Sequence, residues 1–306
     1  MTSIAHVPGK KNAIRHSNGD KLLLTFITVF LVVFFLIVAY PILYVLSCSI
    51  SDPAAILAGK VTVFPVGFTL EGIQTTLTYA RIYTGLVNSL FYAVSSVLIN
   101  LVLTVMCAYP LSRADFQGKN AIMFLCAFTM WFSGGMIPGY MLVRDLGMLN
   151  TVWAIIIPSA MSVYNMIIMR TYFQSSIPNE LLESAQLDGC SDLRFLWSIV
   201  LPLSGPILAV IALYSFVGQW NAYFDAFLYL SDRDLYPMQL ILREILLMND
   251  ASLVEGLDIE EYERRVMMGE LLKYSSIVIS SIPVILLYPF VQKYFVKGVM
   301  IGALKG

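Results

Sequence analysis

Residues 22–46 read LLLTFITVFLVVFFLIVAYPILYVL and contain no charged side chain. An α-helix rises about 1.5 Å per residue, so a run of this length spans the hydrocarbon core of a bilayer, which is about 30 Å thick. The basic residues Lys10, Lys11, Arg15 and Lys21 before it would also suit a signal peptide. The apolar run outlasts the roughly 7 to 15 residues of such a peptide. The stretch therefore predicts a first membrane-spanning helix.

Five further apolar windows of similar length follow in the 306-residue chain. They cover residues 86–111, 121–143, 152–172, 201–224 and 275–295. The whole chain is 58% hydrophobic and only 13% charged, whereas soluble domains carry roughly 25% charged residues. We therefore predict an all-α membrane protein with six transmembrane helices embedded in a lipid bilayer.

Composition also excludes several classes of protein. A formal net charge of -1 argues against a nucleic-acid partner, because neutralising phosphates requires a concentrated basic surface. The four cysteines form no CxxC pair, and both histidines, His6 and His16, lie in a polar N-terminal tail. No nucleophile and base stand at a spacing typical of an enzyme. The sequence predicts no metal site, no cofactor and no catalytic residue.

A modest excess of Lys and Arg marks one side of the predicted membrane as cytoplasmic. This orientation places both chain termini in the cytoplasm and makes residues 1–20 a cytoplasmic tail. It puts Lys60 and Glu255 outside, the latter in a long outer segment, residues 225–273. Long segments translocate largely regardless of their charge, so the basic residues of this one do not oppose the assignment.

The predicted spans contain polar residues, but their centres carry no Asp, Glu, Lys or Arg. Ion-coupled carriers usually hold ionisable groups inside the membrane, where such groups are costly and kept for function. Their absence weakens the reading as a secondary transporter. Asn165 and Gln219 could line a polar pathway, or like Asn88 and Asn100 could form hydrogen bonds between helices.

The segment between the fourth and fifth windows predicts a helix that is too short to span the membrane. Pro178 suits a first helical turn, Glu180 and Glu183 follow it, and Gly189 suits a C-terminal stop. A helix of about ten residues is about 15 Å long, which is too short to cross the bilayer. A second helix is expected to start near Ser191, and prolines beyond it should kink the entry to the fifth span.

This segment resembles the EAA loop of ABC importer permeases, in which EAA is followed after three residues by G and after nine more by I-x-L-P. Ser184 in place of the first alanine is the one departure, a change between small residues. The matching residues are Glu183, Ser184, Ala185, Gly189, Ile199, Leu201 and Pro202.

Further stretches resemble the carbohydrate branch of these permeases, the maltose-type proteins. They are residues 220–223, 292–298 and 302–306. Residues 134–140, 146–150 and 169–173 are similar to permeases for complex oligosaccharides within that branch. Alternatively, Gly134, Gly135 and Pro138 simply break a helix, and Trp220 is an anchor at the membrane interface.

The resemblance implies the type I importer (MetI-like) permease fold over residues 21–306, with a coupling loop at residues 176–202. It implies a bacterial inner-membrane protein that works with a second similar permease, two ATPase subunits and an extracytoplasmic solute-binding protein. No Gly-Lys pair in this chain completes a phosphate-binding P-loop, so ATP hydrolysis is expected in another chain. The residues that would couple to the ATPase are Glu183, Ser184, Ala185, Asp188, Gly189, Leu201 and Pro202.

The resemblance also implies a carbohydrate substrate, which suits a polar, uncharged pathway of amides and aromatic rings. The candidate pathway residues are Asn165, Gln219, Trp220, Asn221 and Tyr223. Residues 225–273 would form the docking surface for the binding protein. A solvated, partly disordered loop is the alternative for residues 249–263, and a secondary transporter without ATPase subunits is the alternative for the whole protein.

Overall fold

The computed structural model describes residues 17–248 and 259–303, and within these ranges the regular structure is helical. The first part of the chain forms α1 (Asn18–Ser49), α2 (Pro53–Leu57), α3 (Glu71–Thr78), α4 (Ala80–Ser112), α5 (Lys119–Trp131), α6 (Met136–Asp145), α7 (Trp153–Ile156) and α8 (Val163–Ser176). The second part forms α9 (Asn179–Leu187), α10 (Asp192–Phe195), a π-helical turn (Leu196–Val200), α11 (Leu201–Leu203), α12 (Gly205–Asn221), α13 (Phe224–Tyr229), a 3₁₀ turn (Arg233–Leu235), α14 (Met238–Met248) and α15 (Ile259–Ala303).

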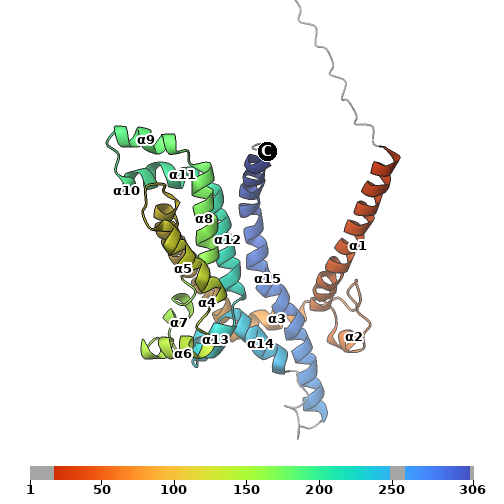
Figure 1. Ribbon diagram of the computed structural model, residues 1–306. Coiled ribbons are helices and arrows are strands. Elements are labelled where there is room, and N and C mark those ends of the chain that lie inside the picture. The colour runs from red at the N-terminus through yellow and green to blue at the C-terminus, as the bar shows by residue number, and fades with distance from the viewer. Residues whose placement is uncertain (1–16, 249–258, 304–306) are drawn as a thin grey trace, which may run out of the picture.

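The helices α4, α8 and α12 pack together as a central bundle, and α15 lies against α12 (Figure 1). Helix α1 leans outward and contacts α15. The short helices gather at the two ends of the bundle. Helices α9, α10 and α11 lie at the end toward which the start of α1 and the last turns of α15 also point. Helices α6, α7, α13 and α14 lie at the opposite end.

Three helices, α1, α4 and the Val266–Pro289 part of α15, are each long and apolar enough to cross a membrane. Two bent pairs pass the same test when each is taken together, α5 with α6 and the α10–α11 segment with α12. The described residues thus provide 3 candidate spans, or up to 5 with the bent pairs. The prediction of an all-α membrane protein is confirmed at this level.

The window at residues 121–143 is not one continuous helix. It divides into α5 and α6, whose axes meet at 109°. Gly135 has a φ of 87°, a left-handed conformation that glycine adopts without the strain a side chain would add. The structure therefore agrees with the alternative that these glycines break a helix.

The window at residues 152–172 is also interrupted. Helix α7 ends at Ile156, and α8 starts only at Val163, where the Ser162 hydroxyl accepts a hydrogen bond from the Asn165 backbone nitrogen. Pro158 lies in the intervening segment and lacks the N–H that a continuing helix would need. Non-helical backbone at membrane depth is tolerated where protein or a polar cavity surrounds it.

The predicted kink at the entry to the fifth window is confirmed. Helices α11 and α12 meet at 80° around Ser204, between Pro202 and Pro206. Each proline removes a backbone donor and crowds the preceding turn, so the helix changes direction here.

The segment at residues 225–273, which the sequence predicts as an outer loop, is largely helical where the structure describes it. Residues 224–229 and 238–248 form α13 and α14, and α15 begins at Ile259, well before the predicted span. Residues 249–258, which include Glu255, lie outside the described residues. Helix α14 packs on α4 and α15 through Met238, Ile241 and Ile245.

Candidate functional site

The short helix predicted between the fourth and fifth windows is present as α9. Pro178 occupies its N-cap and Asp188 its C-cap. After the last turn, the Cys190 backbone nitrogen donates to the Ala185 carbonyl at 2.9 Å, closing the end of the helix. Gly189 takes a φ of 72° at this turn, and a Cβ built there would meet nothing within 4 Å. Glycine is therefore favoured by backbone conformation rather than by crowding.

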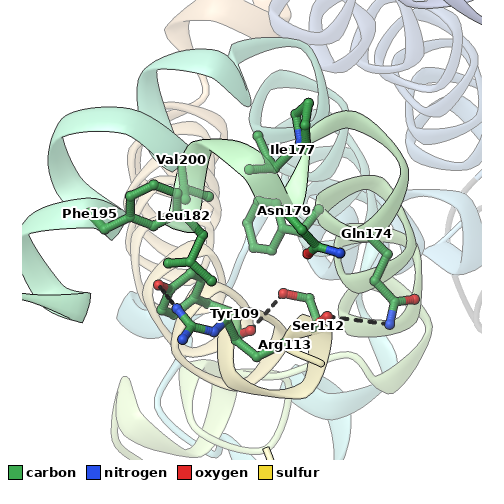
Figure 2. A pocket seen from close by; sticks show the side chains of 11 residues that line it. Tyr109, Ser112, Arg113, Gln174, Ile177, Asn179, Leu182, Phe195 and Val200 are labelled. Carbon is green, nitrogen blue, oxygen red and sulfur yellow. Dashed lines mark hydrogen bonds between the residues drawn. The ribbon is translucent and has the colours of Figure 1, made fainter. Parts of the chain in front are cut away.

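One face of α9 is packed against the bundle. Ala185 is 8% exposed and belongs to the same core cluster as Phe173, Phe195 and Val200. Leu182 packs against this cluster and points into the space beneath α9 (Figure 2). These contacts connect α9 to α8 and to the π-helical turn, so a displacement of α9 must carry those elements or break apolar contacts.

The opposite face of α9 is open. Glu183, Ser184 and Asp188 are exposed, and Leu187 is 90% exposed. The sequence pattern points to the three polar residues but not to Leu187, whose exposure depends on the tertiary structure. Leu201 and Pro202 do not join this surface; they lie on α11, where Leu201 packs against the core cluster and Pro202 is exposed.

A small cavity of about 40 Å³ lies under α9 (Figure 2). It is bounded by the last turn of α4, by α8 and by the start of α9, and its size suits only a few waters at most. Its lining side chains include Tyr109, Ser112, Arg113, Gln174, Asn179 and Leu182.

Arg113, immediately after α4, is the centre of a polar cluster at this end of the bundle. Its Nε and Nη2 donate to the two carboxylate oxygens of Asp115 at 2.9 and 2.8 Å. Its Nη1 donates to Asp192 Oδ1 at 3.0 Å and to the Tyr109 hydroxyl at 3.1 Å. The hydrogen bond from Arg113 lowers the pKa of Asp115 to about 2, so this carboxylate stays ionised at neutral pH. Sequence analysis did not single out this cluster.

The carbonyl groups at the end of α4 are also held by side chains. Arg170 Nε donates to the Leu111 carbonyl at 2.9 Å, and Lys119 Nζ donates to the carbonyl of Arg113 at 2.9 Å. Gln174 Nε2 donates to the Ser112 carbonyl at 3.4 Å. Cationic donors at a helix C-terminus satisfy its free carbonyl groups and complement the helix dipole. The end of α4 is thus bound to α8 and α5 as well as to α10.

A larger cavity of about 440 Å³ lies toward the other end of the bundle. It is bounded by α4, by the break between α7 and α8, and by the last turns of α12. Two of the predicted pathway residues, Asn165 and Gln219, line it. The remaining polar lining side chains are Asn100, Ser159, Ser162, Tyr164, Tyr214, Ser215 and Asp225.

Hydrogen bonds join side chains of this lining in two groups, one around Asn100 and one between Ser159 and Gln219. The Ser215 hydroxyl donates to Asn100 Oδ1 at 2.9 Å, and the Asn100 amide donates to the Ala160 carbonyl at 3.2 Å. The Ser159 hydroxyl lies 3.0 Å from Gln219 Oε1. The broken helix therefore contributes both its backbone and its serines to the cavity. Burial raises the pKa of Asp225, the one acidic group among the lining residues.

The other predicted pathway residues lie elsewhere. Trp220 is 1% exposed, stacks on Phe216 and donates from Nε1 to the Ser280 carbonyl at 3.1 Å. Asn221 borders an apolar cleft between α1, α12 and α15. Tyr223 is 42% exposed, with the Arg243 guanidinium 5.9 Å from its ring centroid. The structure therefore brings Asn165 and Gln219 together and separates them from Trp220, Asn221 and Tyr223.

Residues 13–301 match the family model described as "Binding-protein-dependent transport system inner membrane component". The chain belongs to this family. The permease is accordingly a multi-pass inner-membrane component of an ABC transport system, whose partners include a binding protein and an ATPase. The expectation of a transport component rather than an enzyme is confirmed by this membership.

Named relatives match nearly the whole permease. It is 39% identical over 277 residues to the polygalacturonan/rhamnogalacturonan transport system permease protein YtcP of Bacillus subtilis (strain 168), covering 90% of this chain and 96% of that protein. It is 26% identical over 275 residues to the arabinooligosaccharides transport system permease protein AraQ of Halalkalibacterium halodurans, covering 88% and 92%.

A solved structure agrees with this assignment. One chain of a bacterial ABC transporter involved in the import of the acidic polysaccharide alginate superposes with a TM-score of 0.82 at 36% sequence identity. The match covers 92% of the permease and 100% of that chain. The permease therefore has the fold of an ABC importer permease.

Proposed function

We propose that this permease imports oligosaccharides, using ATP hydrolysed by separate subunits. The relatives named above belong to transport systems for polygalacturonan/rhamnogalacturonan and for arabinooligosaccharides, and the related solved structure belongs to a transporter that imports the polysaccharide alginate. The polar cavity of this chain supports the same substrate class, because its amides and hydroxyls can form hydrogen bonds with sugar hydroxyls.

The coupling site in this proposal is α9. The observation that carries it is the division of α9 into a buried face, with Leu182 and Ala185, and an open face with Glu183, Ser184 and Asp188. The open face receives the ATPase subunit, and the buried face passes its displacement to the bundle. Gly189 sets the turn after the helix, while Leu201 and Pro202 hold the bend into α12.

The substrate path in this proposal follows the polar cavity. Asn165 and Gln219 contact the sugar, together with Asn100, Ser159 and Ser215 of the same cavity. Broken helices commonly form such sites in transporters, because their free backbone groups need polar surroundings. Asn221 and Tyr223 do not line this cavity; in the proposal the path continues past them beyond the last turn of α12, while Trp220 holds α12 against α15.

The assembled transporter in this proposal contains a second homologous permease, two ATPase subunits and an extracytoplasmic binding protein in a bacterial cytoplasmic membrane. Six spans cross that membrane, α5 and α8 among them, and both chain termini are cytoplasmic. Residues 1–20 form the cytoplasmic tail, and residues 225–273 of the permease domain face the binding protein. In Figure 1 the start of α1, helix α9 and the last turns of α15 lie at the same end of the molecule, which supports this orientation.

The test of the coupling site compares three variants of the complete transporter in proteoliposomes. Glu183→Lys reverses a charge on the open face, and Gly189→Val forces a β-branched residue into a left-handed turn, which we expect to cost about 1–2 kcal/mol. Both variants should abolish oligosaccharide transport and the stimulation of ATPase activity by the oligosaccharide. The permease should still insert into the membrane. Glu71→Lys is the control, since Glu71 is an exposed helical residue at the opposite end. Transport at the wild-type rate by Glu183→Lys, at normal expression, would refute the coupling role.

A further inference from the structure

Arg113 connects α4 to the segment that follows the coupling helix. Its Nη1 reaches Asp192, the first residue of α10, across 79 positions of sequence. The Tyr109 hydroxyl adds a longer contact of 3.5 Å to the Asp192 carbonyl. Helix α10 begins three residues after the turn at Gly189. Arg113 therefore binds the span α4 to the C-terminal side of the coupling loop.

The arginine is held more firmly than a surface ion pair. Its side chain is only 11% exposed, and Figure 2 shows it under α9 beside Tyr109. Exposed ion pairs contribute little to stability because water and salt screen them. The guanidinium of Arg113 is instead largely covered, and its two hydrogen bonds to the Asp115 carboxylate fix its orientation. The carbonyl groups of Leu111 and Arg113 are meanwhile held by Arg170 and Lys119.

Helix α4 also reaches the polar cavity. Asn100 lies on α4 thirteen residues before Arg113, the residue that directly follows this helix, which corresponds to about 20 Å along the helix axis. Asn100 accepts the hydrogen bond of Ser215 and donates to Ala160, so it lies at the centre of one hydrogen-bonded group of the cavity lining. A continuous helix thus has the Arg113 cluster at one end and the cavity near its middle.

We propose that Arg113 is a positioning residue that transmits the movement of α9 and α10 to α4 through its ion pair with Asp192. This inference rests on the proposed coupling role of α9. When the ATPase subunit displaces the coupling loop, the pair makes α4 follow, and Asn100 moves relative to α12. Apolar contacts of Leu182 and Ala185 hold α9 to α8, against which α4 also packs, and the Arg113 pair connects α4 directly to α10.

The structure offers a matched control. Asp115 and Asp192 both pair with Arg113, at 2.8 and 3.0 Å, and their side chains are 66% and 67% exposed. Asp115 belongs to the turn directly after α4, so its pair stays within one element. Asp192 belongs to the coupling loop. Asp115→Asn and Asp192→Asn each leave Arg113 one carboxylate, and only the second removes the ion pair with α10.

The experiment measures oligosaccharide transported per ATP hydrolysed in proteoliposomes, normalised to assembled transporter. We expect Asp192→Asn to assemble with its ATPase normally but to lower this ratio about five-fold or more, the range typical of coupling between sites. Asp115→Asn should stay within about two-fold of the wild type. Arg113→Gln should lower the ratio about as much as Asp192→Asn does. The double variant Arg113→Gln with Asp192→Asn should lower it little further, since both substitutions remove the same ion pair.

Equal losses for Asp115→Asn and Asp192→Asn would overturn the inference, and so would a loss confined to assembly with a normal ratio per assembled complex. A normal ratio for Asp192→Asn combined with loss of transport in Glu183→Lys would reject the role of Arg113 and leave the coupling site intact. Normal transport by Glu183→Lys would instead reject the proposed coupling site itself.

Discussion

Neighbouring residues of the permease have different roles because a helix turns about 100° per residue. Gln219 and Trp220 are adjacent on α12, yet Gln219 faces the polar cavity and Trp220 is buried against Ser280 of α15. On α9, Ala185 is buried while Ser184 is exposed. The character of a side chain alone does not reveal which of these faces it occupies.

The two neighbours Gln219 and Trp220 yield a prediction at the residue scale. Trp220→Ala should lower the yield of assembled permease, because removing a buried indole costs about 3–5 kcal/mol in packed cores, while transport per assembled complex stays near normal. Gln219→Ala should assemble normally and lower transport several-fold, because it removes a polar group from the cavity. The measurements are complex yield by size-exclusion chromatography and oligosaccharide uptake per complex. The reverse pattern would return Trp220 to the substrate path and remove Gln219 from it.

At the scale of helices, breaks in the helices shape the polar cavity, and a close approach of two helices holds another part of the molecule together. The interruption between α7 and α8 supplies Ser159 and Ser162 to the cavity, and the bend around Ser204 directs α12 away from the coupling loop. At the other end of the molecule, α4 and α14 approach closely at Gly85, where a Cβ would lie 3.2 Å from the Met238 Cα.

The contact at Gly85 gives a prediction at the helix scale. Gly85→Ala should lower the thermal stability of the purified permease, because the new methyl group meets backbone that cannot yield without moving α14. Overpacking of this kind typically costs about 1–3 kcal/mol. Gly139→Ala in α6 is the control, since its Cβ would meet nothing within 4 Å. A thermal shift assay in detergent compares the two; equal melting temperatures would show that α14 adapts freely.

At the scale of the whole molecule, the proposed function gives the two ends of the bundle distinct tasks. One end carries α9 and the Arg113 cluster, and the other carries α6, α13 and α14 (Figure 1). The polar cavity lies between them, so a signal from the ATPase must travel along helices to reach it. Long continuous helices such as α4 suit this task because they move as rigid bodies.

The orientation of the molecule is open to a direct test. In a variant without its four native cysteines, Glu183→Cys should resist a membrane-impermeant maleimide added to intact cells, because α9 faces the cytoplasm in the proposed orientation. Lys60→Cys should react, since Lys60 is exposed beyond α2 at the opposite end. Labelling after cell lysis controls for the reactivity of both sites. Modification of position 183 in intact cells would invert the proposed topology.

The sequence by itself determined the features that rest on local patterns. The apolar runs indicate a helical membrane protein, since the bilayer requires long uncharged helices. Pro178, the acidic first turn and Gly189 predict the bounds of α9, because caps and left-handed turns depend on adjacent residues. The spacing from Glu183 to Pro202 resembles the importer permeases, and the family match confirms that assignment.

Only the tertiary structure decided which distant residues meet. The contact of Arg113 with Asp192 and the hydrogen bond of Ser159 with Gln219 join positions 79 and 60 residues apart. Nothing periodic in the sequence marks such pairs, because they depend on how whole helices pack. The breaks at Gly135 and Pro158 could not be decided from the sequence either. An apolar window predicts a span, but the tertiary surroundings decide whether its glycine or proline interrupts the helix.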